Sequence, residues 1–310
     1  METILIAGGT GLVGTRLTEI LIEQGYKVIL LSRSEKASSN HPSLSYAYWN
    51  PAKGVVDTKA IAAADHIINL AGAGVADKRW SPERKKEIRD SRVFAGETIV
   101  KALRETPHKV QTVVNASAQG WYGPDPAAHA DGFREEDKPF ADYLATTCVD
   151  WERSVEGIEA LGIRLAKIRI GIVLANGGGA LKEFRKPLAF RVATVLGSGK
   201  QLVSWIHVDD LCHIFLHTIR HKNLSGPYNA AAPHPVSNKE LIETLARVKF
   251  GNNFISVPVP AFVLKIMMGE MSIEVLKSCT ISADKIQKAG FSFQFPTIER
   301  ALANLEKNNS

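Results

Sequence analysis

The sequence predicts an α/β protein in which a doubly wound parallel sheet is joined to a smaller C-terminal α+β region. Apolar runs of strand length alternate with amphipathic helical patterns through the first half of the chain, as in open parallel sheets. A glycine-rich segment at residues 8–14 separates the first apolar run from the first helical pattern, which is typical of a strand–turn–helix unit. The length of 310 residues favours about two domains, or one domain with a large appendage.

The elements of the first half follow one another closely. Residues 4–7 form a continuous apolar run, which is typical of a parallel strand covered on both faces. The apolar residues of the following helix lie on one side of it, and residues 28–31 form the next strand, so residues 3–31 make one βαβ unit. Further strands are predicted at residues 66–70, 110–115 and 164–171, and further helices at residues 82–104 and 143–161.

The second half of the chain is richer in loops. Glycines gather at residues 177–179 and 197–199, on either side of one apolar helix. Short helices are predicted at residues 237–249, 260–268, 282–288 and 297–307, with prolines and glycines between them. We therefore predict a larger domain made of residues 1–172 and 203–231, and a smaller region made of residues 173–202 and 232–310.

The composition is that of a globular protein, since 45% of the residues are hydrophobic and 23% are charged. Disorder and collagen-like repeats are thereby excluded. The three cysteines, Cys148, Cys212 and Cys279, are odd in number and far apart. Their spacing excludes a disulfide framework and a Cys-x-x-Cys metal site, so we expect no metal and a reducing, cytoplasmic location.

The chain carries 38 Lys and Arg against 32 Asp and Glu, a formal net charge of +6. The excess is spread along the chain, which favours a mild preference for anionic ligands and predicts no binding of nucleic acid. We expect no signal peptide, because Glu2 stands where a positive charge is needed and the first apolar run stops at the glycines. The apolar stretch 257–268 is interrupted by Pro258, Pro260 and Lys265, so no membrane span is expected.

Gly8, Gly11 and Gly14 form a Gly-x-x-Gly-x-x-Gly pattern between the first strand and the first helix. Such glycines make a tight turn, let the backbone approach a pyrophosphate, and let the helix pack closely on the sheet. The N-terminus of the helix then offers unpaired N–H groups and a positive dipole to the phosphates. The pattern and its context predict a Rossmann domain that binds a dinucleotide.

The end of the second strand indicates which dinucleotide is bound. NAD sites usually place an acidic residue about 20 residues past the glycines, where it accepts a hydrogen bond from the ribose 2′-hydroxyl. This chain has Ser32 and Arg33 there, and the next carboxylate is Glu35. A guanidinium group pairs well with a 2′-phosphate, so the hypothesis is a preference for NADP(H).

Other segments resemble the extended short-chain dehydrogenase/reductase superfamily. Residues 69–72 (NLAG) are similar to its strand end beneath the adenine, and residues 115–117 (NAS) with Tyr122-Gly123 to the strand end that carries its catalytic serine. Residues 205–210 (WIHVDD) resemble the segment that rejoins the sheet. The nearest resemblance is to the atypical subgroup called the epimerase family, which includes family 39U. Its markers here are Arg79-Trp80, Asp90-Ser91-Arg92, Cys148, Trp151-Glu152, residues 177–180 and residues 289–291.

The resemblance implies a set of cofactor contacts along the carboxyl ends of the strands and on the helix that begins after Ser81. They are Gly8, Thr10, Gly11, Leu12, Ser32, Arg33, Leu70, Ala71, Glu87, Arg92 and Val173, to which the turn itself adds Gly14. Without the resemblance, the charged run around Glu87 would be interpreted as a solvated helical face.

The chain departs from the superfamily in its catalytic residues. The resemblance implies a serine that orients the substrate oxygen, a tyrosine that transfers the proton, and a lysine four residues later that lowers the tyrosine pKa. Tyr143 is followed at that distance by Thr147, and a register set by Glu152 gives Leu144 and Cys148 instead. Neither register contains Tyr-x-x-x-Lys, and a tyrosine with an ordinary pKa of about 10 is a poor base at neutral pH.

The candidate catalytic residues are therefore Ser117, which could hold the reacting oxygen, and Tyr122 or Tyr143 as the proton partner. Cys148 is better explained as a small buried residue than as a nucleophile. The sequence of His207, Asp209 and Asp210 is better explained by the start of a helix than by a metal site.

The leading hypothesis is an NADP(H)-dependent oxidoreductase or epimerase that acts on a hydroxyl or carbonyl of a small-molecule substrate, with sugar nucleotides as one candidate class. The smaller region would form the substrate side of the crevice. The alternative is a non-catalytic NADPH-binding sensor that lacks the Tyr–Lys pair, and a Rossmann-type RNA-binding protein is a third possibility. The protein is expected to be a monomer or a homodimer.

Overall fold

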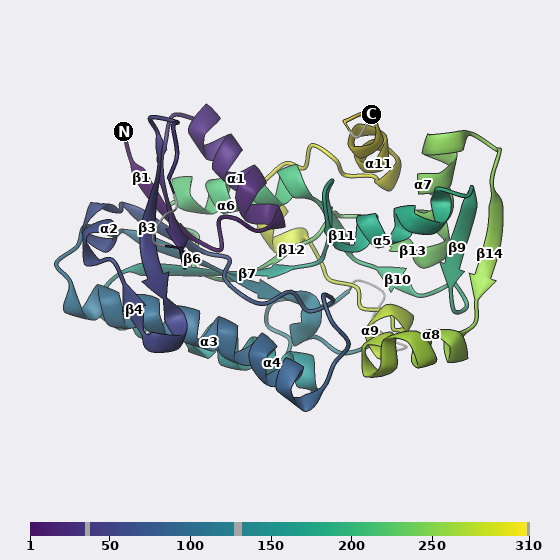
Figure 1. Ribbon diagram of the computed structural model, residues 1–310, viewed down its shortest axis with the longest axis horizontal. Coiled ribbons are helices and arrows are strands. Elements are labelled where there is room, and N and C mark those ends of the chain that lie inside the picture. The colour runs from purple at the N-terminus through teal and green to yellow at the C-terminus, as the bar shows by residue number, and fades with distance from the viewer. Residues whose placement is uncertain (35–37, 127–131, 309–310) are drawn as a thin grey trace.

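The computed structural model describes residues 1–34, 38–126 and 132–308 (Figure 1). The strands of its central sheet are β1 (Thr3–Ala7), β2 (Lys27–Ser32), β3 (Leu44–Asn50), β4 (Val55–Val56), β5 (His66–Asn69), β6 (Thr112–Ala118), β7 (Arg164–Ile170) and β12 (Gly226–Ala230). They form an eight-stranded sheet in the order β12-β7-β6-β5-β1-β2-β3-β4. Neighbouring strands from β12 to β3 are parallel, and β4 is antiparallel to β3. The prediction of a doubly wound, mostly parallel sheet is confirmed.

Helices cover both faces of the sheet (Figure 1). They are α1 (Leu12–Glu23), α2 (Thr58–Ala63), α3 (Pro82–Glu105), α4 (Tyr143–Arg153) and α6 (Val208–Arg220). Successive side chains of β1 point to opposite faces, as the pleat requires. Ile4 and Ile6 pack with residues of α1 and α6, whereas Leu5 and Ala7 pack with residues of α2 and α3. This burial on both sides explains why β1 is a continuous apolar run.

The structure corrects two details of the first half. The helix predicted over residues 143–161 ends at Arg153, where Ser154 Oγ donates to the Trp151 carbonyl at 2.7 Å, and a 3₁₀ helix follows at Glu156–Leu161. Gly157 within that second segment disfavours a continuous α-helix. Strand β3 was not predicted, because it is a half-buried strand in which Ala47 and Trp49 alone are fully covered.

The remaining strands and helices lie outside the central sheet. Three pairs of short strands lie there: β8 (Ile172–Leu174) with β11 (Trp205–His207), β9 (Val192–Leu196) with β14 (Ile255–Val259), and β10 (Leu202–Val203) with β13 (Val236–Ser237). The helices are α5 (Gly179–Leu188), α7 (Asn238–Phe250), α8 (Ala261–Met268), α9 (Ser272–Leu276), α10 (Asp284–Lys288) and α11 (Ile298–Lys307). The four helices predicted in this part are confirmed as α7, α8, α10 and α11.

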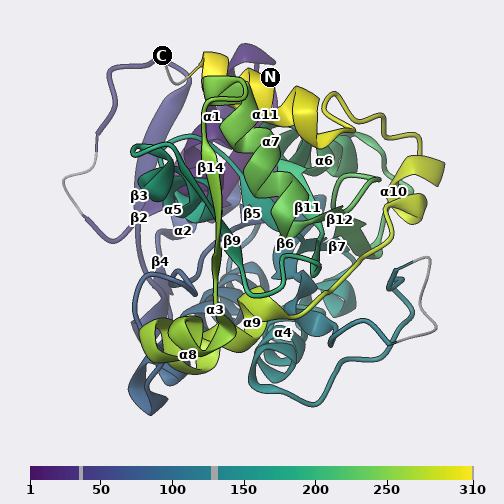
Figure 2. The same cartoon turned by 90° about the vertical axis from the view of Figure 1, so that its right-hand side faces the viewer.

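Strand β14 was missed by the sequence prediction. It contains Pro258, and its partner β9 lies about sixty residues earlier in the chain, so no local pattern reveals the pair. Figure 2 shows β14 and β9 side by side, with α8 below them. The division of the chain into a larger domain and a smaller region stays a prediction. Within the described ranges, no helix has the length and apolar character needed to cross a bilayer.

Candidate functional site

The turn between β1 and α1 presents bare backbone at the carboxyl end of the sheet. Gly8 has a φ of 80°, in the left-handed region that glycine adopts without strain. The Gly11 N–H donates to the Gly8 carbonyl at 3.1 Å, which closes the turn. Helix α1 starts with Gly11 as its N-cap, so no side chain caps it, and its first turn contains no acidic residue. The helix N-terminus is therefore open to an anionic ligand.

The turn also requires glycine because there is no space for a side chain at two of its positions. A Cβ atom at Gly8 would lie 2.8 Å from the Leu70 carbonyl carbon, closer than real side chains come. A Cβ atom at Gly14 would collide with the Gly8 carbonyl oxygen. Gly8 and Gly14 thus let β1, α1 and the end of β5 meet closely, and this cradle fits a dinucleotide pyrophosphate.

The end of β2 carries an exposed cation. Ser32 Oγ accepts a hydrogen bond from the Ser34 N–H at 3.0 Å, which orders the backbone around Arg33. Arg33 is exposed, and among the residues that the structure describes no carboxylate forms an ion pair with its side chain. Its guanidinium is free to bind a phosphate group. Thr10 is likewise exposed, at the tip of the glycine turn.

The ends of β5 and β6 are joined by a buried amide pair. Asn69 Nδ2 donates to Asn115 Oδ1 at 2.7 Å, and Asn69 Oδ1 accepts from the Ala71 N–H at 3.2 Å. These bonds fix the backbone of Leu70 and Ala71 beside Gly8. Two of the predicted contacts, Leu70 and Ala71, thus lie directly against the glycine turn.

Helix α3 brings Arg92 to the same edge. The Arg92 side chain lies against Gly72, its Nη1 donates to the carbonyls of Ala73 at 2.9 Å and Ile88 at 2.7 Å, and it stacks on the Trp151 ring at 4.9 Å. Within the described part of the chain no carboxylate pairs with Arg92, and burial lowers the pKa of its guanidinium. A half-buried guanidinium with no carboxylate partner among the described residues is suited to an anionic or electron-rich ligand.

Two further predicted contacts lie at the margins of this edge. Glu87 is exposed and accepts from Arg84 Nη1 at 2.6 Å, so its carboxylate already has a cationic partner. Val173 lies in β8 beside Ile206 of β11. Leu12 packs against the glycines at 178 and 179, which places the start of α5 near the start of α1.

Ser117 lies in a buried network rather than on an open surface. Its side chain is 1% exposed, and its Oγ donates to Glu152 Oε1 at 2.7 Å. Glu152 also accepts from Arg169 Nε at 2.8 Å and Arg169 Nη2 at 3.2 Å. The buried ion pair therefore holds the Ser117 hydroxyl, and these contacts argue against a direct contact of Ser117 with substrate.

Tyr122 belongs to the same network. Its hydroxyl donates to Asn229 Oδ1 at 2.8 Å and accepts from Arg169 Nη1 at 2.9 Å. The side chain is fully buried, and burial raises the pKa of the phenol well above its ordinary value. Both hydrogen-bonding roles of the hydroxyl are used, so the structure argues against Tyr122 as the proton partner.

Sequence reasoning missed Arg169 and Asn229, which complete this network. A signal was present, because Arg169 interrupts an apolar strand at a position that the pleat buries. A buried guanidinium needs a buried carboxylate, and Glu152 was noticed only as a family marker.

Tyr143 lies apart from that network, in the first turn of α4. Its hydroxyl donates to the Lys85 carbonyl at 2.9 Å, and its ring meets Trp80 edge to face at 5.1 Å. Burial raises the pKa of Tyr143, while the positive charge of Arg92 acts in the opposite direction. Of the three predicted catalytic residues, Tyr143 alone lies near Arg92.

The positions that would hold a Tyr-x-x-x-Lys pair in the second register are apolar. Leu144 and Cys148 both face Gly120, at 3.3 Å and 3.6 Å from where its Cβ would lie. Cys148 is 4% exposed, and burial raises the pKa of its thiol to about 12. The thiol is therefore protonated at neutral pH and does not act as a nucleophile.

The start of α6 has the structural role that the sequence indicates. His207 is the N-cap, and its Nδ1 accepts from the Asp209 N–H at 3.1 Å. Asp209 pairs with Arg16 of α1, and Asp210 accepts from the Gln294 N–H at 2.8 Å. Among the described residues, no three histidines, cysteines or carboxylates are grouped so that they could hold a metal ion.

Comparison with known proteins agrees with this geometry. A model of the NAD-dependent epimerase/dehydratase family matches residues 4–231, and a model of a domain of unknown function, DUF1731, matches residues 259–305. The chain is 35% identical over 305 residues to the epimerase family protein SH2119 of Staphylococcus haemolyticus, an alignment that covers 98% of this chain and 99% of the relative.

Two solved structures are similar as well. The human epimerase family protein SDR39U1, solved with NADPH, is 26% identical with a TM-score of 0.84, over 99% of each chain. A nucleoside-diphosphate sugar epimerase from Corynebacterium glutamicum is 28% identical with a TM-score of 0.77, over 98% of this chain and 58% of that one. Since the family model spans most of the chain and the staphylococcal relative aligns over nearly all of it, the protein belongs to the NAD-dependent epimerase/dehydratase family, among the epimerase family proteins.

Proposed function

We propose that the protein binds NADP(H) across the glycine turn and acts as an oxidoreductase, or as an epimerase that uses NADP, on a hydroxyl or carbonyl group. Two observations carry the proposal: the α1 N-terminus has no side-chain cap, and the exposed Arg33 at the end of β2 forms no ion pair with any carboxylate that the structure describes. The first suits a pyrophosphate and the second a 2′-phosphate. The human relative was solved with NADPH, which supports the choice of cofactor.

Different residues of the chain would bind different parts of the cofactor. The backbone at Gly8, Gly11 and Gly14 would receive the pyrophosphate, and Ser32 with Arg33 would receive the phosphate of the adenosine ribose. When bound, NADPH supplies hydride chemistry. Leu70, Ala71 and Val173 would line the crevice, where apolar side chains exclude water.

Tyr143 is the proton partner in this proposal, and Arg92 is a positioning residue that acts on it. Ser117 and Tyr122 are bonded within the buried Glu152–Arg169 network, whereas Tyr143 is half-buried and lies outside that network, with its hydroxyl donating to the Lys85 carbonyl. Burial raises the pKa of Tyr143 overall, and the positive charge of Arg92 acts against that rise. Arg92 thus supplies the positive charge that a lysine gives in the superfamily.

The cofactor assignment is tested with Arg33→Ala. Loss of a charged hydrogen bond to the 2′-phosphate is expected to weaken NADPH binding about tenfold to a hundredfold, and to leave NADH binding unchanged. Fluorescence titration of both nucleotides measures this. Arg300→Ala is the matched control, since Arg300 is an exposed arginine on α11. Equal affinities for NADPH in Arg33→Ala and in the wild type would refute the assignment.

A second candidate function is a non-catalytic NADPH-binding sensor. It is favoured by Leu144 and Cys148 at the positions of the missing Tyr–Lys pair, and by the enclosed hydroxyl of Ser117. Incubation with NADPH and a panel of aldehydes, ketones and nucleotide sugars separates the two. The catalytic proposal expects NADPH oxidation with at least one carbonyl and its loss in Tyr143→Phe, with NADPH affinity retained. A sensor would bind NADPH and oxidise none of it.

We further propose a cytoplasmic protein that is a monomer or a homodimer and takes a small-molecule substrate. The three cysteines are free and buried, which suits a reducing compartment. A sugar nucleotide is one substrate class to test first, because the similar Corynebacterium protein is a nucleoside-diphosphate sugar epimerase.

A further inference from the structure

A cavity of about 400 Å³ opens at the edge of the sheet opposite the glycine turn. His66, Thr112 and Arg164, the first residues of β5, β6 and β7, form one wall. Arg220 and Lys222, at and after the end of α6, form another. The glycine turn follows the carboxyl end of β1, so this amino-end cavity is separate from the proposed cofactor site. Its volume is within the usual range for small-molecule sites.

The cavity is strongly basic. Arg164, Arg220 and Lys222 line it, with Glu2 as the one carboxylate among its lining residues. Arg220 bonds to neutral partners, its Nε to the Tyr26 hydroxyl at 3.3 Å and its Nη2 to Gln24 Oε1 at 2.9 Å. In the described ranges, none of the three cations forms an ion pair with a carboxylate. The positive charge of the cavity is therefore available to a ligand.

Part of this charge has a structural explanation. Arg164 Nη1 donates to the carbonyls of Thr218 at 2.8 Å and Leu224 at 2.7 Å, and Nη2 donates to the Ile219 carbonyl at 3.1 Å. These bonds cap the C-terminus of α6, whose dipole favours a cation there. Capping accounts for Arg164 but not for Arg220 and Lys222, which are exposed beside it.

His66, which lines the same cavity, carries a buried polar atom that has no partner in the described part of the chain. Its Nδ1 atom is buried and has no hydrogen-bond partner in the described structure, whereas its Nε2 atom lies 3.7 Å from Glu2 Oε1. The neighbouring Asp65 is already bonded to Lys109 at 2.8 Å and to the Thr3 N–H at 2.8 Å. A buried polar atom without a partner is rare in folded proteins.

We propose that the amino-end cavity binds a small polyanion with a phosphate or pyrophosphate group, held by Arg220 and Lys222, with Arg164 adding positive charge. Guanidinium and ammonium groups are the side chains that recognise phosphates. The ligand would bind at a distance from the crevice of the proposed enzyme and independently of its cofactor.

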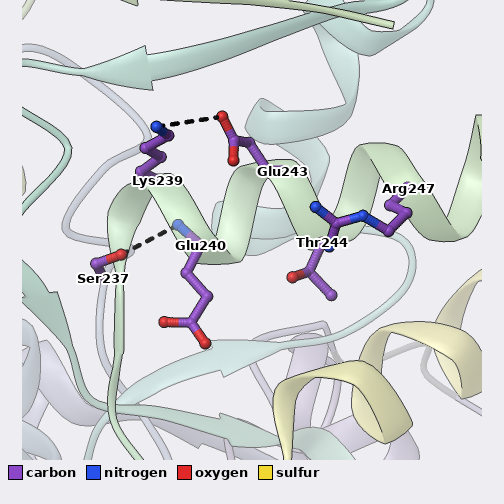
Figure 3. Close-up of a pocket in the computed structure, with 6 residues that line it drawn as sticks. All are labelled: Ser237, Lys239, Glu240, Glu243, Thr244 and Arg247. Carbon is purple, nitrogen blue, oxygen red and sulfur yellow. Dashed lines mark hydrogen bonds and ion pairs between the residues drawn. The ribbon is translucent and has the colours of Figure 1, made fainter. Parts of the chain in front are cut away.

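A second hollow in the structure lacks these features. It has a volume of about 200 Å³ and lies along α7 and its N-cap (Figure 3). Figure 3 shows Lys239 directed toward Glu243, at 3.9 Å, and Ser237 accepting from the Glu240 N–H. Two cations and two carboxylates line it, and its lining residues come from one helix and its N-cap, so nothing there favours an anion.

The test is a calorimetric titration with sodium pyrophosphate. The Arg220→Ala/Lys222→Ala double variant is expected to bind pyrophosphate at this site about tenfold or more weakly than the wild type. The control is Arg300→Ala/Lys101→Ala, which removes the same charge from two exposed residues elsewhere and should bind as the wild type does. The glycine turn is unchanged in both, so the affinity for NADPH should stay the same. This separates the proposal from the cofactor assignment.

Three results would overturn the proposal. Equal weakening in both double variants would mean an adventitious ion only, and so would binding that disappears at physiological salt. An RNA oligomer that loses affinity in the cavity variant, while pyrophosphate does not, would assign the surface to nucleic acid. If the Arg220→Ala substitution lowers the melting temperature below that of the control, the pyrophosphate affinity of the single variant Lys222→Ala decides instead, and an affinity equal to that of the wild type would overturn the proposal. Parallel titration with ADP shows whether the phosphates are recognised free or on a nucleotide.

Discussion

Gly8 shows how one residue joins backbone conformation to ligand binding. Its φ of 80° and the 2.8 Å gap to the Leu70 carbonyl carbon exclude any side chain. The same absence of a side chain exposes the amides at the start of α1. The absence of a side chain at Gly8 should therefore matter both for the stability of the fold and for the proposed binding of the cofactor.

The prediction at this residue is that Gly8→Ala loses measurable NADPH binding and about 2 kcal/mol or more of unfolding free energy, through backbone strain and the clash. Gly25→Ala is the matched control, because Gly25 has a φ of 82° and no atom lies within 4 Å of the place its Cβ would take. Urea denaturation and NADPH titration of both variants measure the difference. Equal losses in the two would show that the clash with Leu70 has no effect.

Glu152 is the residue on which the buried network depends. It accepts hydrogen bonds from Ser117 and Arg169, and the side chains of the ion pair are 5% and 3% exposed. Arg169 also lies 3.7 Å from the centre of the Trp121 ring, so the guanidinium is enclosed by its partners. Removing the carboxylate leaves a positive charge in a site without water.

We expect Glu152→Gln to lower the unfolding free energy by about 3–5 kcal/mol, the usual result of breaking a buried ion pair. Ser117→Ala, which removes one hydrogen bond to the same carboxylate, should cost about 1 kcal/mol. Chemical denaturation of the two variants gives both values. A loss below about 1 kcal/mol in Glu152→Gln would show that water or another group compensates Arg169.

At the scale of elements, α1 and α6 are joined by an ion pair with two contacts. Arg16 Nε donates to Asp209 Oδ1 at 2.7 Å and Arg16 Nη2 to Asp209 Oδ2 at 3.2 Å. Burial opposes ionisation of Asp209, but the hydrogen bonds and charge of Arg16 prevail and hold the pKa of the carboxyl below its ordinary value. The pair connects the first βαβ unit to the helix that returns the chain to the sheet.

This pair predicts a pH dependence of stability. A carboxyl whose pKa is lower in the folded state stabilises the fold above its unfolded pKa of about 4, and this contribution is lost as the pH falls through the folded value. Asp209→Asn should therefore be about 0.5–1 kcal/mol less stable than the wild type at pH 7, because Arg16 is partly exposed. The difference should shrink as the pH falls below about 4 and disappear below the lowered pKa of the folded state. Glu97→Gln, at an exposed carboxylate of α3 outside this pair, is the control.

Over the whole molecule, burial is distributed unevenly. Every residue of β5 and nearly every residue of β1 and β6 is buried, whereas four of the five residues of β14 are exposed. The smaller region has its own apolar core, in which α7 and α11 pack together with α5. Exposed apolar side chains, among them Phe262, Ile266 and Met267, lie on α8.

Hydrogen exchange should reflect this distribution. Amides of β1, β5 and β6 are expected to exchange only through global unfolding, because they are buried on both faces of the sheet. Amides of β14 should exchange by local opening, at least a hundredfold faster. Exchange measured by mass spectrometry on peptides from these strands checks the order. Equal protection of β14 and β5 would indicate that another chain covers the edge of β14.

Structural features that depend on neighbouring residues could be predicted well from the sequence. The glycine turn needs particular residues within a span of seven, and the strand–helix alternation repeats over short stretches, so both are visible in the order of amino acids. Four helices of the second half, α7, α8, α10 and α11, were predicted for the same reason. Strand β3 was not predicted because it is only partly buried. Strand β14 was not predicted because its partner β9 is distant in sequence.

By itself, the sequence determined the parallel α/β fold, the glycine turn and the absence of a Tyr-x-x-x-Lys pair, since each is a property of neighbouring residues. Only the tertiary structure decided the surroundings of Ser117 and Tyr122. Their partners Glu152, Arg169 and Asn229 come from α4, β7 and β12, and packing of the sheet brings them together. Burial and hydrogen bonding arise between distant segments, so residue type alone cannot show whether a hydroxyl meets substrate or protein.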